Sequence, residues 1–209
     1  HSQTQRYTRI ALFYLLILLA AYPVTSLALA PTQGAVASAH PAATQAGIEI
    51  LKAGGNAFDA AIAVNAVLAV VEPYGSGLGG GGFWLLHRAR DGKQTMLDGR
   101  ERAPLAAHRD MYLDAKGEVI DGASINGPLA AGIPGVPAAM AHLAKNYGRL
   151  PLSKSVAPAI RLAKQGFAVD EQYRRYAGLR LETMRKDAET ARIFLLKNDV
   201  PPVGHLLKQ

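Results

Sequence analysis

The sequence predicts a mixed α/β fold, of the α+β kind, in which helices alternate with strands. Helix-like and strand-like apolar segments follow one another along most of the chain, and an Asp-Gly turn between two short apolar runs predicts a β-hairpin. The chain has 209 residues, of which 49% are hydrophobic and 19% are charged. A chain of this length and composition can bury a core, so the sequence excludes a disordered protein.

The N-terminal residues differ in composition from the rest of the chain. Arg6 and Arg9 precede an uncharged apolar run over residues 10–24, and small residues follow it up to Ala30. This order is typical of a secretory signal peptide, and the run is short compared with the roughly 20 apolar residues of a spanning helix. We therefore predict a signal peptide over residues 1–28, export to the periplasm or the medium, and no stable membrane span.

A short strand and a helix are predicted next. Small apolar residues indicate a strand over residues 35–39. A helix is predicted over residues 41–53, because its first residue is a proline and Ile48 and Leu51 lie on one face of it. The glycine pair 54–55 then supplies the left-handed conformation with which helices commonly end.

The following helix is predicted over residues 57–71 and belongs to the core. Asn56 suits its N-cap, and Asp59 stands three residues later, where a capping-box acid returns a hydrogen bond to the cap. Almost every residue of the segment is Ala, Val, Ile or Leu, so the helix is apolar nearly all round. Such a helix must be buried on most of its faces.

A β-hairpin and three further helices complete the predicted elements. Strands are predicted over residues 83–86 and 95–97, around the Asp-Gly turn of residues 90–93. Helical periodicity bounded by Gly or Pro predicts three helices, over residues 136–145, 153–164 and 170–184.

Residues 75–82 form a glycine-rich segment that contains the spacing of a dinucleotide-binding fingerprint twice. That fingerprint requires a strand before the glycines and a helix after them, whereas here a helix precedes and a strand follows. A nucleotide site is therefore not expected. The glycines indicate a close approach of the backbone, either to another segment of the chain or to a ligand.

Composition and spacing also limit metal and nucleic-acid sites. The chain has no Cys, and its six His residues show no i, i+4 pair and no carboxylate at metal-ligand spacing. We expect no metal and no cofactor, and we assign His40 to a helix entry with its ring bonded to the backbone. The net charge of +7 arises in residues 145–209, which carry 13 basic and 6 acidic side chains, and we expect no nucleic-acid partner.

Arg100 follows the second strand of the predicted hairpin and begins a short charged segment with Glu101 and Arg102. A guanidinium offers a planar fork that matches a carboxylate, which Lys cannot imitate. The residues alone leave two interpretations open. Either one of these arginines binds the carboxylate of a substrate, or the arginines form surface ion pairs with Glu101.

Six ordered sequence blocks resemble the N-terminal part of the gamma-glutamyltranspeptidase family. The resemblance extends from about Gly34 to Val169, whereas the stretch from Arg174 onward fits the family poorly. The blocks are SAHPA at 38–42, GIEILKAGGNAFDAA at 47–61, VEP at 71–73, SGLGGGGF at 76–83, LDGRERAP at 97–104 and IPGVP at 133–137.

The resemblance implies an N-terminal-nucleophile hydrolase, whose fold is a four-layer αββα sandwich. Such a protein is made as a precursor that cleaves itself into a large and a small subunit. Residues 29–209 would be the N-terminal part of the large subunit, an incomplete domain whose partner is the small subunit of the same precursor. The implied reaction removes a gamma-glutamyl group, typically from glutathione, through an acyl-enzyme and passes it to water or to an amine.

The resemblance also implies one site residue in this chain. Arg100 matches the family arginine that holds the α-carboxylate of the glutamyl substrate. The family nucleophile is a threonine at the N-terminus of the small subunit, where its own amine serves as the base. That threonine is expected beyond Gln209, so we expect no catalytic residue in this chain and no activity of the chain by itself.

Two other interpretations remain open. A cephalosporin or glutaryl acylase is an amide hydrolase of the same implied fold, with a serine as its nucleophile. A truncated, non-catalytic product would instead bind a ligand or a partner without turnover. In each case, a sheet that lacks strands from another subunit would expose edges and apolar faces.

Overall fold

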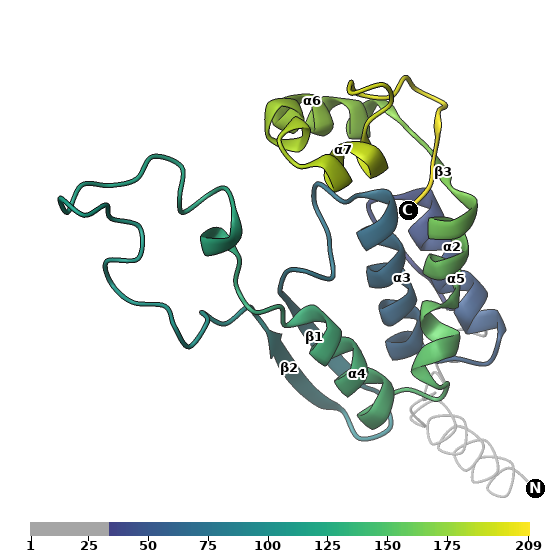
Figure 1. Ribbon diagram of the computed structural model, residues 1–209. Helices are drawn as coiled ribbons and strands as arrows, with labels where there is room; N and C mark the ends of the chain where they lie inside the picture. The colour runs from purple at the N-terminus through teal and green to yellow at the C-terminus, as the bar shows by residue number, and fades with distance from the viewer. Residues whose placement is uncertain (1–33) are drawn as a thin grey trace, which may run out of the picture. The chain divides into compact units, whose positions relative to one another are not determined.

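Helix α3 (Ala57–Val71) lies among the other helices of the computed structural model, which describes residues 34–209 (Figure 1). Helix α2 (Pro41–Lys52) packs along one side of α3. Helices α4 (Val136–Asn146) and α5 (Leu152–Gln165) cover further faces of it. The prediction of a core helix that is buried on most faces is therefore confirmed.

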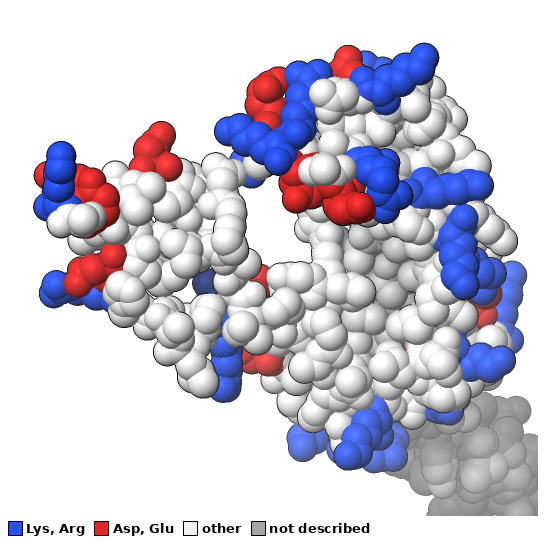
Figure 2. Space-filling model, in the orientation of Figure 1, with Lys and Arg blue, Asp and Glu red and all other residues white. Residues whose placement is uncertain are grey.

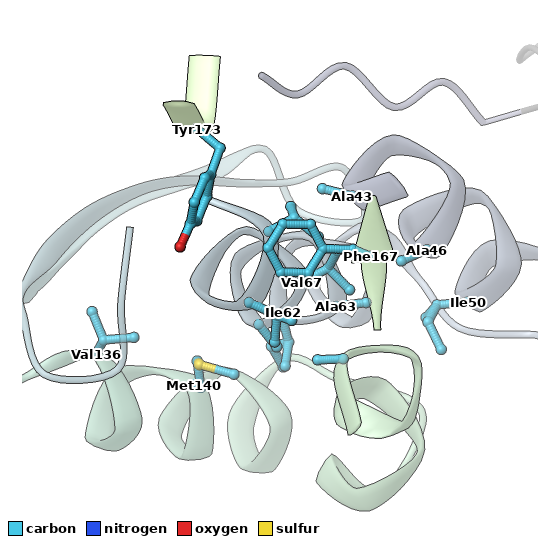
Figure 3. Packing of buried hydrophobic residues seen from close by; sticks show 14 of the residues in the cluster. Ala43, Ala46, Ile50, Ile62, Ala63, Val67, Val136, Met140, Phe167 and Tyr173 are labelled. Atoms are coloured by element: carbon cyan, nitrogen blue, oxygen red, sulfur yellow. The ribbon is translucent and has the colours of Figure 1, made fainter. Parts of the chain in front are cut away.

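The core centres on the side chains of α3. Ile62, Ala63 and Val67 have no exposed surface, and Met140 from α4 and Phe167 lie close around them (Figure 3). Burial of one Val or Ile side chain stabilises a fold by about 1.5 to 3 kcal/mol. The contacts of α3 therefore supply a large share of the stability of the fold.

Helix α2 begins and ends as predicted, but a different face of it is buried. The Nδ1 atom of His40 accepts the backbone N–H of Ala42 at 3.1 Å, and Gly54 beyond the helix has φ of +90°. Ile48 and Leu51 are only half-buried, because small residues on the neighbouring face allow closer packing of α3. The fully buried residues of α2 are Ala43, Ala46, Gly47 and Ile50.

The capping box predicted for α3 is present. The side chain of Asn56 accepts hydrogen bonds from the backbone N–H groups of Phe58 and Asp59, at 2.9 and 3.1 Å. The carboxylate of Asp59 accepts the backbone N–H of Asn56 at 2.9 Å. These bonds satisfy N–H groups that the first turn of a helix leaves without partners.

Strands β1 (Gly82–Arg88) and β2 (Lys93–Gly99) form the predicted antiparallel hairpin. Successive side chains of a strand point to opposite faces. Leu86 therefore enters the helical core, whereas Leu85 and its cross-strand neighbour Met96 point outward and are 81% and 64% exposed. The hairpin thus has one buried and one open apolar face.

The strand predicted over residues 35–39 does not form. No backbone hydrogen bond joins this segment to a strand within residues 34–209. A strand is stabilised by the ladder of hydrogen bonds to its neighbour, and the described residues offer this segment no neighbour.

The later helices are confirmed, and the structure adds elements beyond them. Helix α6 (Glu171–Arg185) begins at the N-cap Asp170, and the sequence did not predict α7 (Ala188–Phe194). The short strands β3 (Phe167–Ala168) and β4 (Leu206–Leu207) pair antiparallel. This pairing brings the buried Leu207 back to the core, and the backbone N–H of Gln209 donates to the carbonyl of Ala163 in α5.

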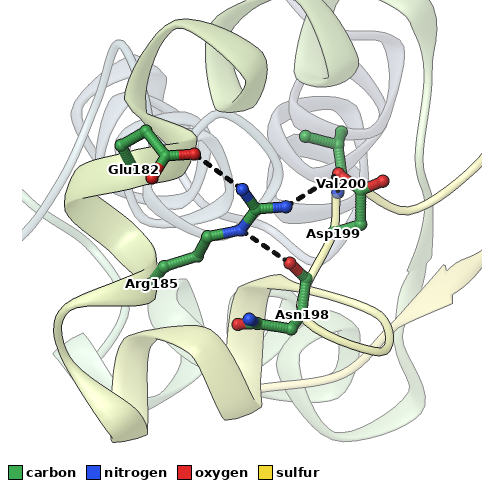
Figure 4. Close-up of polar contacts among 5 residues, drawn as sticks. All are labelled: Glu182, Arg185, Asn198, Asp199 and Val200. Carbon is green, nitrogen blue, oxygen red and sulfur yellow. Dashed lines mark hydrogen bonds and ion pairs between the residues drawn. The ribbon is translucent and has the colours of Figure 1, made fainter.

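Arg185 holds a tight turn beyond α7 (Figure 4). Its guanidinium donates to the backbone carbonyl of Asn198 at 2.9 Å and to Glu182 at 2.6 Å, and it lies 3.7 Å from the carboxylate of Asp199. Lys197 and Asn198 both have positive φ, as the central residues of the tightest hairpin turns do. The turn therefore depends on a side chain from another element.

A long segment of residues 103–132 extends away from the helices (Figure 1). It contains the short helix η1 (Pro128–Ala130). Arg180 of α6 donates to the side-chain oxygen of Asn126 at 2.6 Å, which ties this segment to α6. Several large apolar side chains of the segment are exposed, namely Leu105, Val119, Ile120, Ile125 and Leu129.

The described residues bear only in part on two predictions, the location of the excess positive charge and the absence of a stable membrane span. On the face drawn in Figure 2, basic side chains gather over α5 and α6, within the segment predicted to carry the excess charge. Among residues 34–209, no helix is both long enough and apolar enough to cross a membrane. The predicted signal peptide of residues 1–28 lies outside the described residues.

Candidate functional site at the end of strand β2

Arg100 is the first residue after β2, and its side chain is exposed. Within residues 34–209, the guanidinium groups of Arg100 and Arg102 form no ion pair and no hydrogen bond. The surface pairing with Glu101, which the sequence left open, is therefore absent from the described structure. Two positive charges without a carboxylate partner remain at this strand end.

A compact turn fixes the backbone at Arg100. The backbone N–H of Arg100 donates to Oδ1 of Asp98 at 2.9 Å. Gly99 between them is buried, and a Cβ atom there would lie 2.6 Å from the ring of Trp84 and 2.9 Å from Cβ of Ala139. The residue before Arg100 therefore has to be a glycine for the chain to pass between these two side chains.

Three segments that are distant in sequence meet at this turn. A Cβ atom on Gly135 would collide with the backbone of Gly99, and the N–H groups of Gly135 and Val136 both donate to the carbonyl of Gly80, at 3.1 Å. Next to them, Arg102 and Ile133 exchange two backbone hydrogen bonds, of 3.1 and 2.7 Å. The turn is therefore held on a rigid support rather than in a free loop.

The glycine-rich segment of residues 75–82 contributes to this support. The carboxylate of Glu101 lies directly against the Cα atom of Gly81, where any side chain would collide with it. A strand, β1, follows the glycines, so the geometry of a dinucleotide site is absent. Of the two interpretations that the sequence left open, close packing against another segment is confirmed for Gly80 and Gly81.

Two open hollows flank Arg100, with volumes of about 320 and 250 Å³. Arg100 and Arg102 line both hollows. Asp98 faces the larger one, and its Oδ1 is already bonded to the backbone of Arg100. The site can therefore bind an anion, and the planar guanidinium groups match the geometry of a carboxylate or a phosphate.

Another cavity, of about 370 Å³, lies between α6, α7 and the end of α3, away from Arg100. Its lining includes Tyr74, Tyr173 and Tyr176. Burial raises the pKa of Tyr74 to about 12, and the nearby charges of Glu72 and Asp170 act in the same direction. Burial also raises the pKa of Tyr173 to about 12. These two phenols stay neutral near pH 7, so they provide no general base there.

Part of this site was not predicted from the sequence. Arg102, one of the two arginines left open as a carboxylate ligand, is exposed and lines both hollows together with Arg100. No sequence pattern connected Gly80 or Gly135 with Arg100, although both stand in the sequence blocks quoted above. Among residues 34–209, no group of three His, Asp or Glu side chains could hold a metal ion.

The comparisons with known proteins identify the family of this chain. The family model described as gamma-glutamyltranspeptidase matches residues 43–209. The chain therefore belongs to the gamma-glutamyltranspeptidase family. The match includes the stretch from Arg174 onward, so the poor fit inferred there from the sequence is corrected.

Known relatives agree with this assignment. The glutathione hydrolase proenzyme of Pseudomonas sp. (strain A14) is 48% identical over 138 residues, which are 66% of this chain and 24% of that protein. The crystal structure of Helicobacter pylori gamma-glutamyltranspeptidase superimposes with a TM-score of 0.80 at 40% identity, and the match covers 84% of this chain and 50% of that one. The predicted fold class is thereby confirmed. The chain spans about a quarter of the length of such curated relatives.

A cephalosporin acylase from Bacillus halodurans is also similar in structure. Its TM-score is 0.68 at 32% identity, and the match covers 87% of this chain and 37% of the acylase. Both values are lower than those for the Helicobacter pylori protein. The fold is therefore shared by both classes of amide-cleaving protein, and the greater similarity is to the gamma-glutamyltranspeptidase.

Proposed function

We propose that this chain supplies the N-terminal part of the large subunit of a gamma-glutamyl acyl-transfer enzyme that hydrolyses glutathione and related compounds. The observation that carries the proposal is Arg100, whose unpaired guanidinium stands on a rigid turn within the family sequence block. The names of the relatives, glutathione hydrolase and gamma-glutamyltranspeptidase, support the same activity.

In the proposed reaction, residues of this chain bind and orient the substrate. Arg100 donates two parallel hydrogen bonds to the α-carboxylate of the glutamyl group. The bound carboxylate limits how far the gamma-carbonyl carbon can lie from Arg100, because only the glutamyl side chain separates the two groups. The small subunit of the same precursor supplies the threonine nucleophile, and the acyl-enzyme then passes its glutamyl group to water or to an amine.

The test uses a composite proenzyme, defined as the Pseudomonas sp. (strain A14) relative with its corresponding segment replaced by residues 34–209. Arg100→Ala should raise KM for gamma-glutamyl-p-nitroanilide by a factor that corresponds to about 2 to 5 kcal/mol. The carboxylate has the same charge in the ground and transition states, so kcat should change much less. Arg100→Lys keeps the charge without the planar fork and should still raise KM.

Arg102→Ala is the matched control for the substitution of Arg100. It removes the neighbouring guanidinium from the same hollows, and we expect a much smaller rise in KM, through the loss of one nearby positive charge. The assignment of the carboxylate site to Arg100 is wrong if Arg102→Ala proves as damaging as Arg100→Ala. It is also wrong if Arg100→Lys behaves like the parent.

An acylase of the cephalosporin or glutaryl type is the second candidate, and the similarity to the Bacillus halodurans enzyme favours it. A glutaryl group is a gamma-glutamyl group without its amine, so Arg100 can bind the carboxylate of either. Comparing kcat/KM for gamma-glutamyl and glutaryl amides of p-nitroaniline separates the two. Preference for the gamma-glutamyl amide supports the first proposal, and preference for the glutaryl amide supports the second.

We also propose that the mature protein is exported to the periplasm or the medium. The basic residues Arg6 and Arg9 ahead of an uncharged apolar run support this proposal. N-terminal sequencing of the secreted protein tests it, since cleavage is expected close to Ala28.

A further inference from the structure

Asp98 stands directly before the turn that carries Arg100 and has its own contact with it. It is the penultimate residue of β2, opposite Phe83 of β1. Its Oδ1 atom accepts the backbone N–H of Arg100 at 2.9 Å. Asp98 forms no ion pair with Arg100 or Arg102, so its link to the site runs through the backbone.

We propose that Asp98 is a positioning residue, which directs the Arg100 guanidinium toward the substrate carboxylate by holding the backbone N–H of Arg100. The proposal rests on the function proposed above. An Asp side chain that accepts the N–H two residues later closes a local turn. That turn fixes the direction in which the chain, and with it the Arg100 side chain, leaves the strand.

The rest of the turn leaves this role to Asp98. Gly99 has no side chain of its own, and its contacts with Trp84, Ala139 and the backbone of Gly135 hold the chain in place without bonding the N–H of Arg100. Two residues after Arg100, the backbone of Arg102 pairs with that of Ile133. Arg100 therefore lies between two fixed points, and the bond to Asp98 is the hydrogen bond that its own backbone N–H makes in the described structure.

The hairpin contains a matched control at its other end. Oδ1 of Asp91 accepts the backbone N–H of Lys93, also two residues later, at 3.3 Å. Asp91 is also exposed, but it lies at the turn between the strands, away from Arg100, and it pairs with Arg88 as well. Substitution of Asp91 therefore measures what the loss of a turn bond and an ion pair costs the hairpin without touching the proposed site.

The experiment uses the composite proenzyme and steady-state kinetics with gamma-glutamyl-p-nitroanilide. Asp98→Ala should raise KM about fivefold, as expected from the loss of one ordinary hydrogen bond, with little change in kcat. Asp98→Asn keeps a side-chain oxygen as the acceptor, so KM should be no higher than in the parent, and the loss of a negative charge from the hollow acts in the same direction. Asp91→Ala should leave KM unchanged, and circular dichroism should show all three variants folded.

A double-mutant cycle separates positioning of Arg100 from a general effect on the fold. If Asp98 acts through Arg100, Asp98→Ala should add no further rise in KM when Arg100 is already alanine. The proposal is overturned if the two effects simply add, if Asp98→Asn is as impaired as Asp98→Ala, or if Asp91→Ala raises KM equally. An inactive parent composite would instead contradict the proposed function itself.

Discussion

Asp59 shows how one buried side chain joins distant parts of the chain. Its carboxylate has no exposed surface and closes the capping box of α3. It also accepts the backbone N–H of Arg149 at 2.9 Å and that of Leu150 at 3.4 Å. The start of α3 and the segment that leads into α5 are therefore held by the same two oxygen atoms.

Asp59→Ala should lower the free energy of unfolding by about 3 kcal/mol, because several backbone N–H groups would lose their acceptor away from water. Asp170→Ala is the control, since Asp170 caps α6 through a single bond to the N–H of Tyr173 at 2.7 Å. That loss should cost about 1 kcal/mol. Urea unfolding of the two variants measures both, and equal losses would show that the bonds to residues 149–150 contribute nothing.

Residue-scale predictions from sequence succeeded where the interaction is local. Asn56 and Asp59 are three residues apart, so the capping box could be inferred from their spacing alone. The bonds from Asp59 to residues 149–150 could not, because no local pattern relates the two segments. For the same reason, the sequence supplied Arg100 through its family block but not the support that Gly80 and Gly135 give it.

Gly166 and Gly178 show how the same residue type has different roles in two elements. Gly166 ends α5 with φ of +94°, and a Cβ atom there would lie 2.8 Å from Leu206 and 3.0 Å from the carbonyl of Leu207. Gly178 stands inside α6, and a Cβ atom there would meet no atom within 4 Å. Position 166 therefore requires glycine. At position 178, glycine has no such role and only lowers the helix propensity of α6.

Gly166→Ala should therefore destabilise the protein by about 2 kcal/mol, because its backbone conformation is nearly restricted to glycine. Gly178→Ala should stabilise it by about 0.5 to 1 kcal/mol through the higher helix propensity of alanine. Thermal unfolding followed by circular dichroism at 222 nm detects shifts of opposite sign. Two shifts of the same sign would contradict this account of the two glycines.

At the scale of elements, the helices could be predicted better than the strands. Periodicity and end signals gave α2 to α6 nearly as they are, because these signals lie within each helix. The strand over residues 35–39 failed because a strand also needs a partner, which its own residues do not specify. Helix α7 was missed because seven residues carry too little periodicity to identify it.

The distribution of exposed apolar side chains is uneven over the whole molecule. Phe83, Leu85 and Met96 form the outer face of the hairpin, and further exposed apolar residues lie in the segment 103–132. An open hairpin with an apolar face and unpaired edges tends to associate with other chains. Such faces are expected for a sheet that lacks strands from another subunit.

The isolated chain should therefore self-associate at micromolar concentrations. Leu85→Glu combined with Met96→Lys places opposite charges directly across the hairpin and should reduce this association without loss of helical circular dichroism. Light scattering coupled to size-exclusion chromatography measures the effect. Leu179→Lys on α6, which removes an exposed leucine elsewhere, is the control and should change little.

The nearly uniform apolar surface of α3 also has a consequence for the order of folding. Helix α2 directly precedes α3 and can pack against it as soon as both exist, because only a short connection has to close. The cover from α4 and α5 comes from the far side of the hairpin and of the long segment 103–132, so these contacts are non-local and slow to form. Until then, one side of α3, the most apolar of the helices within residues 34–209, faces water, and a growing chain is most exposed to misassembly in that interval.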